Sequence, residues 1–348
     1  MKKQITILTA IILFFAMTMD AKVWRVNNRT NVQADFTTLS SAIGGASAGD
    51  TIYLEGSPDS YGSAGYISKP LTFIGTGYFL NENDSSQVFK ESSKVSYMVF
   101  YDGSEGSVVE GITFIGNSYL IYITGADNIT IRKNRFVSQY QNGGKSINIT
   151  SISDSLLIEH NWIEPVTSNA SSTNYGIYFS KYTTNSVIRN NIILADTSDF
   201  AIYMNEENAT STLTITNNTI KGDIETFYSA QYNNILIDGT YTSGTGDVTS
   251  NNLCNATQYS NANGNVQNVD MSTVFMDYTA TVDNGYILKT GSPAESAGVN
   301  GDDCGAYGTN DPYMSGGMPA IPAIFGFEIS QTIGSPTIPV TIKAMSHK

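Results

Sequence analysis

An asparagine recurs along the middle of the chain in similar short words, and this repeat constrains the fold more than any other feature. The words are NITIRKNRFV (128–137), SLLIEHNWIE (155–164), NSVIRNNIIL (185–194) and TLTITNNTIK (212–221). In each word an aliphatic residue precedes the shared asparagine by three positions, and another apolar residue follows it by two. The aligned asparagines are Asn134, Asn161, Asn191, Asn218, Asn234 and Asn252, and Gly111 is assigned to the same slot one step earlier. A repeat of this period is typical of proteins that stack one structural unit on the next.

Each repeat reads as three short strands joined by turns. The apolar positions favour Ile and Val and alternate with period two between Gly, Asn and Ser, and no repeat contains a stretch of helical periodicity. A leucine-rich repeat would need Leu at the apolar positions and usually a helical segment in each repeat, and this sequence has neither. The sequence therefore predicts an all-β parallel β-helix, in which the asparagine turns inward at a tight bend and bonds to the next asparagine. Steps of 16 to 30 residues between asparagines predict loops of variable length at one corner of the coil.

The two ends of the repeat region carry a family resemblance. DFTTLSSAIGGASAGDTIYL with the later KPLTFIGTG, and YILKTGSPAESAGVNGDDCGAYG near the other end, resemble the opening and closing segments of pectin-lyase-like right-handed β-helix proteins. The resemblance covers roughly residues 33–310. It implies a right-handed, single-stranded parallel β-helix solenoid with a short N-terminal capping helix, in which GDTIYL is the first strand. It does not imply an activity, because that family includes lyases, hydrolases, epimerases and non-catalytic proteins.

Residues 1–21 read as a secretory signal peptide. Two lysines precede an apolar run of about 13 residues, which is short for a transmembrane helix, and a plausible cleavage site follows Ala21. A retained anchor is the alternative. We expect a bacterial protein that is secreted, periplasmic or on the cell surface and is not inserted in a membrane after cleavage. The β-helix is expected over 22–316, and the Pro-rich tail 317–348 is expected to pack on the β-helix or on a partner.

The net charge limits the classes of molecule that the protein can bind, and its two cysteines raise the question of a disulfide. Cleavage after Ala21 would leave a net charge of −14, which repels nucleic acid and anionic membranes. An extracellular polysaccharide or cell-surface glycan is the expected partner. Cys254 and Cys304 allow one disulfide in an oxidising compartment, and two buried thiols are the alternative. We expect no cofactor and no metal, and no motif supports a calcium site.

One column of residues faces outward on the strands that precede the asparagine words. In IYI (121–123), INI (147–149), IYF (177–179) and IYM (202–204) the flanking apolar side chains are expected to point inward. The middle residues Tyr122, Asn148, Tyr178 and Tyr203 then point outward. Such a column can stack on sugar rings, or its tyrosines can stack on one another.

A second column lies two residues before the ladder asparagines. It contains Arg132, Glu159 and Arg189, whose charges alternate from coil to coil. The arginines could hold a sugar carboxylate, which makes all three residues candidates for carbohydrate binding. The alternative is a ladder of ion pairs, each of which adds only about 0–1 kcal/mol of stability.

The sequence lacks the catalytic words of the enzymes that share the predicted fold. The words NTD, DD, GHG and RIK on consecutive coils mark polygalacturonase-like members, and RxPxxR marks calcium-dependent pectate lyases. DD occurs once, as Asp302–Asp303 outside the stacked coils, and the other words do not occur. We therefore expect a non-catalytic glycan-binding or adhesive surface protein. A polysaccharide lyase or glycoside hydrolase acting on plant or host glycans is the alternative, with Tyr178 or Tyr203 as a candidate base.

Overall fold

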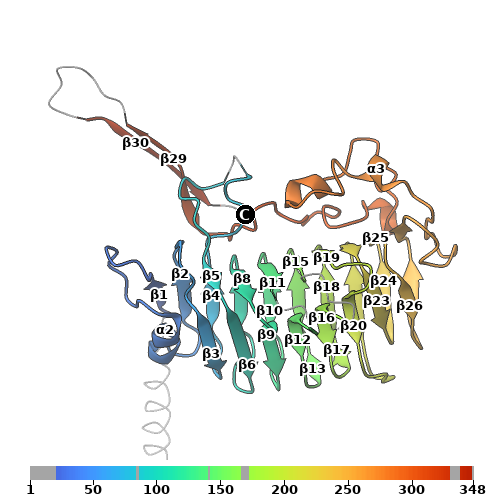
Figure 1. The fold of residues 1–348 in the computed structure, drawn as a ribbon, viewed down its shortest axis with the longest axis horizontal. Coiled ribbons are helices and arrows are strands. Elements are labelled where there is room, and N and C mark those ends of the chain that lie inside the picture. Colours follow the sequence, from blue (N-terminus) through green and yellow to red (C-terminus); the bar gives the residue numbers. More distant parts are fainter. Residues whose placement is uncertain (1–20, 84–85, 140–141, 166–171, 330–337, 347–348) are drawn as a thin grey trace, which may run out of the picture.

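The computed structural model describes residues 21–83, 86–139, 142–165, 172–329 and 338–346. The chain winds repeatedly around one axis, and its turns build three long sheets that run side by side along a cylinder (Figure 1). Neighbouring strands in these sheets are parallel and come from successive coils. The predicted parallel β-helix is confirmed.

Sheet A has ten strands, and sheets B and C have eight each. The strands of sheet A are β1 (Val23–Val26), β2 (Thr51–Leu54), β4 (Thr72–Ile74), β7 (Val108–Glu110), β10 (Thr130–Arg132), β14 (Leu157–Glu159), β18 (Ser186–Arg189), β21 (Leu213–Thr216), β24 (Ser229–Tyr232) and β27 (Val248–Ser250). The strands of sheet B are β3 (Ser63–Ile67), β6 (Tyr97–Tyr101), β9 (Tyr119–Thr124), β12 (Lys145–Ile149), β16 (Tyr175–Phe179), β20 (Phe200–Met204), β23 (Asp223–Thr226) and β26 (Tyr241–Ser243). The strands of sheet C are β5 (Lys94–Val95), β8 (Thr113–Gly116), β11 (Arg135–Ser138), β15 (Trp162–Glu164), β19 (Ile192–Leu194), β22 (Thr219–Lys221), β25 (Ile235–Ile237) and β28 (Leu253–Cys254).

The interior of the cylinder is mostly apolar. Aliphatic residues of the repeat stack there on their counterparts one coil away, as Ile158, Ile188 and Ile215 do in sheet A. The N-terminal end is covered by α2 (Leu39–Gly45), which buries Leu39 and Ile43 against the same core. The predicted capping helix is therefore present, although β1 precedes it and GDTIYL forms β2 rather than the first strand.

The corner between sheets A and C is a constant two-residue turn from β7 to β28. Its first residue has a left-handed backbone, with φ between 50° and 72°. These first residues are Gly111, Lys133, His160, Asn190, Asn217, Asn233 and Asn251. The predicted slot of Gly111 is wrong by one position, because Glu110 pairs with Arg132 and so Gly111 aligns with Lys133. Loop length varies at both other corners, not at the single corner that the sequence suggested.

The second residue of each turn forms a buried asparagine ladder. In the repeating pattern, the Asn161 side-chain oxygen accepts hydrogen bonds from Asn134 N (3.0 Å) and Asn134 Nδ2 (3.2 Å). Asn161 Nδ2 in turn donates to Ile131 O and to Asn191 Oδ1, 2.8 and 2.9 Å away. The structure places in this ladder Asn134, Asn161, Asn191, Asn218, Asn234 and Asn252, and extends it to Asn265.

After the last coil the chain runs back over the corner between sheets A and C, as the orange ribbon in Figure 1 shows. We call residues 297–316 the return segment. It follows α3 (Met271–Val274) and η1 (Asp283–Tyr286) and contains η2 (Val299–Gly301). Its backbone bonds to the left-handed turn residues in succession: Ala297 to Asn251, Val299 to Asn233, Asp303 to Asn217, Ala306 and Gly308 to Asn190, and Asp311 to His160.

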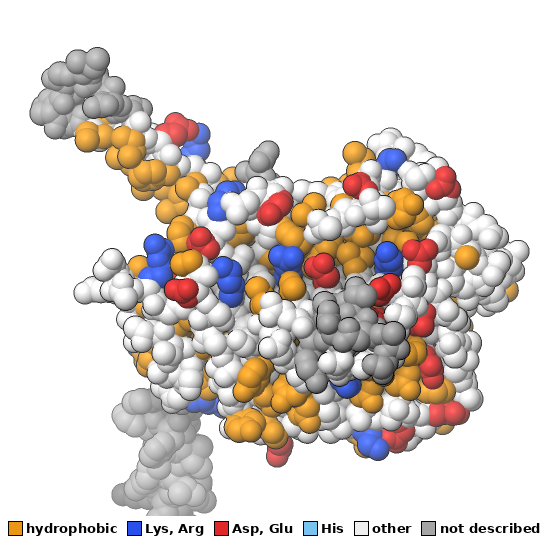
Figure 2. Space-filling view, in the orientation of Figure 1, with side chains coloured by type: hydrophobic (Ala, Val, Ile, Leu, Met, Phe, Trp, Pro, Cys, Tyr) orange, Lys and Arg blue, Asp and Glu red, His pale blue; other side chains and the backbone are white. Residues whose placement is uncertain are grey.

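The chain ends in an antiparallel hairpin of β29 (Pro322–Ile329) and β30 (Val340–Ser346). The hairpin projects from the cylinder and exposes a row of hydrophobic side chains (Figures 1 and 2). The start of the tail packs on the cylinder as expected, since Met318 is buried and Ile324 O accepts a hydrogen bond from Val88 N (2.7 Å), whereas the rest of the described hairpin extends away from the coils. The difference arises because the two strands satisfy their backbone groups with each other. Contact with a partner stays a prediction.

Cys254 and Cys304 are free and buried, so the predicted disulfide is not formed. The two thiols lie on opposite sides of sheet C. Cys254 points into the cylinder, whereas Cys304 packs in the separate apolar cluster between the outer face of sheet C and the return segment. Each thiol donates instead to a backbone carbonyl, that of Ala256 or Asn251.

The predicted signal peptide lies outside the described residues, apart from Ala21. Among the residues that the structure describes, none of the helices has the length and apolar content needed to cross a bilayer.

Candidate functional site

Sheet B presents a row of outward side chains that follows one line across successive coils. Tyr122, Asn148, Tyr178 and Tyr203 are paired in register, one from each of β9, β12, β16 and β20. Their flanking apolar residues are fully buried, as the inward and outward phase requires. The three tyrosines are half-buried. Asn148 is only 8% exposed, since its short side chain lies between larger neighbours in the row.

A second aromatic row lies beside the first. Tyr119, Tyr175 and Phe200 stand three residues before Tyr122, Tyr178 and Tyr203, and in each strand both intervening residues are buried. Strict alternation would turn the earlier residue inward. Instead each earlier ring contacts the later ring of its own strand, with centroids 4.7 to 4.9 Å apart. We call these two rows together the aromatic face.

Four rings form the centre of this face. Tyr175 is stacked on Phe200 of the next coil (5.7 Å, 6° between planes), and Tyr178 is stacked on Tyr203 (5.6 Å, 19°). We call these four rings the ring cluster. Stacking across coils holds the rings side by side, and their half-buried positions leave part of each ring open to solvent. Burial raises the pKa of Tyr175 and of Tyr203, so both hydroxyls stay protonated and can donate hydrogen bonds.

Two polar side chains of β12 lie at one side of the ring cluster. Lys145 Nζ lies 5.2 Å from the ring centre of Tyr175 and 4.6 Å from that of Tyr178. Burial lowers the pKa of Lys145, and it forms no ion pair with a carboxylate of the described residues. Asn148 Oδ1 is buried without a hydrogen-bond donor in the described part of the chain. Lys145 is partly exposed and can meet a ligand, whereas the Asn148 oxygen is covered by its neighbours.

Two carboxylates of β23 lie at the other side of the ring cluster. Asp223 pairs in register with Phe200, and Glu225 pairs with Tyr203, so both rows end in an acid. Burial, together with the nearby Asp199, raises the pKa of Asp223. Asp223 accepts a hydrogen bond from Thr240 N (2.7 Å), and neither acid has a Lys or Arg partner among the described residues.

The charged column predicted beside the asparagines lies on sheet A, away from the aromatic face. Arg132 binds Glu110 of the preceding coil (NH2 to Oε2, 2.8 Å), and Arg189 binds Glu159 of the preceding coil (2.6 Å). Each guanidinium is therefore already occupied by a nearly buried carboxylate. Arg132, Glu159 and Arg189 are not brought together with the tyrosines, and their geometry is that of a structural ion-pair ladder.

Three potential metal ligands meet on the return segment side of sheet A. One ligand atom from each of Glu159, His160 and Asp311 lies within 4.8 Å of the others. The Arg189 guanidinium already pairs with both acids, since its Nη2 atom lies 2.6 Å from Glu159 Oε2 and 3.7 Å from Asp311 Oδ2. A metal ion would have to displace that guanidinium, so the arrangement favours an ion-pair network.

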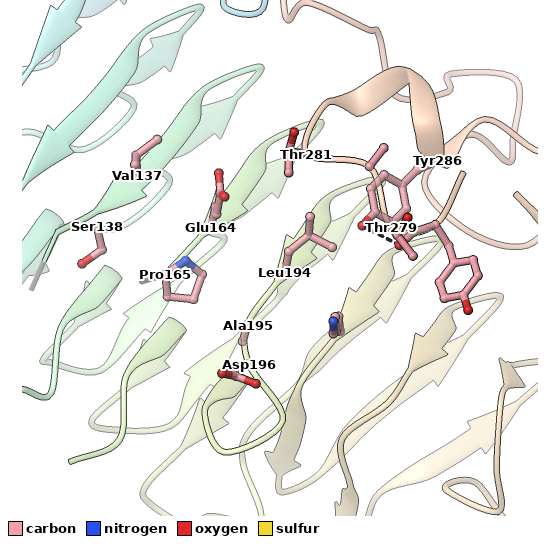
Figure 3. Close-up of a pocket in the computed structure, with 13 residues that line it drawn as sticks. Val137, Ser138, Glu164, Pro165, Leu194, Ala195, Asp196, Thr279, Thr281 and Tyr286 are labelled. Atoms are coloured by element: carbon pink, nitrogen blue, oxygen red, sulfur yellow. Dashed lines mark hydrogen bonds between the residues drawn. The ribbon is translucent and has the colours of Figure 1, made fainter. Parts of the chain in front are cut away.

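A separate cavity of about 500 Å³ lies over the outer face of sheet C, beneath the segment that leads into η1. Figure 3 shows Val137, Glu164 and Leu194 from successive strands on one side and Thr279 and Tyr286 on the other. The Glu164 carboxylate is already engaged, since it accepts a hydrogen bond from Trp162 Nε1 (3.2 Å) and lies 3.6 Å from Arg135. Among the described residues that line this cavity, there is no ring platform and no run of unpaired polar groups comparable to that on sheet B.

Comparison with known proteins identifies the fold family. Residues 83–252 match the family model for a right handed beta helix region, which agrees with the order and direction of the strands. The chain is a right-handed parallel β-helix protein. The right-handed parallel β-helix that the resemblance implied is thereby confirmed. No curated protein sequence matches this β-helix protein.

A solved structure similar to this β-helix protein is the crystal structure of pectate lyase Pel9A. The sequences are 13% identical, and the similarity covers 83% of this chain and 96% of that chain with a TM-score of 0.39. A likeness of this size says nothing about activity.

The sequence interpretation missed half of the aromatic face of the β-helix protein. Tyr119, Lys145, Tyr175 and Phe200 were overlooked because period-two alternation assigns them to the interior. The available signal was the repeated spacing of an aromatic residue three positions before each outward tyrosine. Asp223 and Glu225 were overlooked because their strand sequence, DIET (223–226), lacks the two aromatic residues that the preceding strands carry.

Proposed function

We propose that this exported β-helix protein binds an extracellular glycan on the aromatic face of sheet B and does not cleave it. The observation that carries the proposal is the pair of adjacent aromatic rows, held in register on β9, β16 and β20. Ring faces of Tyr and Phe pack against the apolar faces of sugar rings, and tyrosine hydroxyls bond to sugar hydroxyls. Coils repeat at about 4.8 Å, so the rows offer a regular series of contacts along a glycan.

The chemistry of the face supports binding better than a tyrosine-based elimination. A lyase base must give up its own proton first, and burial with the neighbouring Glu225 raises the pKa of Tyr203. Tyr203 is therefore deprotonated less readily than a free tyrosine, so the tyrosinate that a lyase needs is scarce and the protonated hydroxyl serves as a hydrogen-bond donor.

Tyr178→Ala tests the proposal, because Tyr178 stacks within the ring cluster but contributes no side chain to the interior. We expect binding to weaken by about 1–3 kcal/mol, with base–aromatic stacking as the analogue. Tyr232→Ala is the matched control, since Tyr232 is an outward, half-buried tyrosine on sheet A. Affinities would be measured by calorimetry on glycans that give hits on an array. No hits, or equal losses in both variants, would refute the proposal.

Glycan cleavage is the second candidate function, and the acids of β23 favour it. Asp223 and Glu225 are half-buried on one strand beside the ring cluster, and their environments differ because burial and Asp199 raise the pKa of Asp223. A carboxyl whose pKa is raised can serve as the acid in hydrolysis, and a second carboxylate beside it can serve as the base. New reducing ends or unsaturated products that disappear in Asp223→Asn and Glu225→Gln would favour this candidate over binding alone.

A further inference from the structure

We propose that the glycan bound on the aromatic face carries positively charged amino sugars, whose ammonium groups are held by Asp223, Glu225 and the adjoining rings. This inference rests on the proposed glycan binding and adds the chemical class of the ligand. It comes from the order of charges along the two aromatic rows.

Each row ends in a carboxylate that lacks a protein cation. Phe200 is followed across β23 by Asp223, and Tyr203 is followed by Glu225, so each acid lies about 4.8 Å from the strand that carries its ring. Neither acid forms an ion pair in the described residues. A half-buried carboxylate beside an aromatic ring suits a ligand ammonium, which gains both a charge-assisted hydrogen bond and a cation–π contact.

The opposite side of the ring cluster is already supplied with a cation. Lys145 Nζ lies over Tyr175 and Tyr178, three coils or about 14 Å from the acids of β23. An ammonium on the ligand is therefore repelled near β12 and attracted near β23. The charges orient the ligand along the rows, with its amine at Asp223 and Glu225.

Asn148 supplies an independent indication that a ligand completes this surface. Its side chain is more than nine-tenths buried within the first row, and its Oδ1 atom accepts no hydrogen bond in the described structure. A buried acceptor without a donor costs stability, and a sugar hydroxyl or amide N–H inserted between the neighbouring rings would satisfy it. The group required is a donor, which amino sugars and their neighbours provide.

The charge of the whole protein points the same way. The net charge is −13 for the full sequence, so the long-range field attracts a cationic glycan and repels a polyuronate. The field alone would attract any polycation to any part of the surface. The local acids of β23 are what would place the amine on the ring cluster.

The test compares two oligosaccharides with the same backbone, one with free amines and one with acetylated amines. A β-1,4-linked glucosamine oligomer and its fully N-acetylated form would be titrated calorimetrically into the full mature chain at a pH where the amines are protonated. We expect the free-amine oligomer to bind about ten-fold more tightly, with the ratio shrinking as salt is added. Glu225→Gln with Asp223→Asn should abolish the ratio. Lys145→Met should leave the ratio unchanged or larger.

Control variants and alternative outcomes separate this inference from the proposed function. Glu82→Gln removes an exposed acid away from sheet B and should leave the ratio unchanged. Equal binding of both oligomers that depends on Tyr178 would overturn the amino-sugar inference and keep glycan binding. A ratio that falls equally in Glu82→Gln and in the β23 variant would overturn the inference in favour of general surface charge. Failure of every glycan to bind would overturn both.

Discussion

Replacing Asn191 by Ala tests whether the asparagine ladder stabilises the β-helix. The Asn191 side chain accepts from Asn161 N and Asn161 Nδ2, both at 2.9 Å, and donates to Ile158 O and Asn218 Oδ1 at 2.8 and 3.0 Å. Alanine removes these four hydrogen bonds and the further contact of Nδ2 with Arg189 O (2.9 Å), which shares the same two amide hydrogens. Asn161 Nδ2 keeps its bond to Ile131 O, whereas Asn161 N–H loses its acceptor in a fully buried turn.

The expected loss follows from these four bonds. A buried N–H left without an acceptor costs about 1–3 kcal/mol, and each of the other three bonds contributes about 0.5–1.5 kcal/mol. We therefore expect Asn191→Ala to lower the free energy of unfolding by about 2.5–7.5 kcal/mol, a large part of the usual stability of a domain. Urea unfolding followed by circular dichroism would measure it. Asn310→Ala, at an exposed asparagine, is the control and should change stability by less than about 0.5 kcal/mol. A loss below about 1 kcal/mol in Asn191→Ala would refute the reasoning.

Three further predictions concern the interior, the return segment and the thiols. Ile188→Asp places a charge in the apolar stack and should cost several kcal/mol, so a melting temperature equal to that of the parent would contradict the packing. Burial lowers the pKa of His160, so the unfolded chain takes up the proton first. Unfolding free energy should therefore fall between about pH 7.5 and about pH 6 in urea melts, with a smaller fall in His160→Gln; equal slopes would argue against it. Because Cys254 and Cys304 are unpaired, a reductant should leave the melting temperature unchanged. Thiol titration of the denatured chain should detect two free thiols. A melting temperature that falls on addition of a reductant would instead indicate a disulfide.

The coil and its ladder could be predicted from the sequence because they depend on local geometry that repeats. Asn161 and Asn191 occupy the same turn, and Ile158 and Ile188 the same strand, so one rule applied in each coil places them all. Asn265 could not be found in this way, because the residue three positions before it is Ala262 rather than the Ile of the four repeated words between 128 and 221.

The aromatic face was only half predictable, since its second row depends on a local departure from alternation. Gly176 and Ile177 are both buried between Tyr175 and Tyr178, and period-two reasoning cannot detect two buried residues in succession. The acids of β23 lie beside the aromatic face because the strand register shifts between Phe200 and Ile202. No local sequence pattern indicates that shift.

The partners of the turn residues were beyond any local pattern. Asn190 and Asn217 read as ordinary turn asparagines, and their left-handed backbone fits that interpretation. Their side chains in fact donate to carbonyls about 90 to 120 residues later in the chain. Contacts at that separation depend on where the return segment travels, and nothing in the repeat specifies its path.

The return segment changes how such a stack can come apart. In a plain solenoid each coil contacts only its neighbours, so end coils can fray independently and a growing chain can fold coil by coil. Here the last part of the domain to be synthesised bonds in turn to Asn251, Asn217, Asn190 and His160, and Gly316 reaches Tyr78. One segment on the outside of the cylinder therefore links several coils to one another. A partly synthesised chain would lack these bonds and its coils would be more open to proteases. It would become a single cooperative unit only when its final segment is in place.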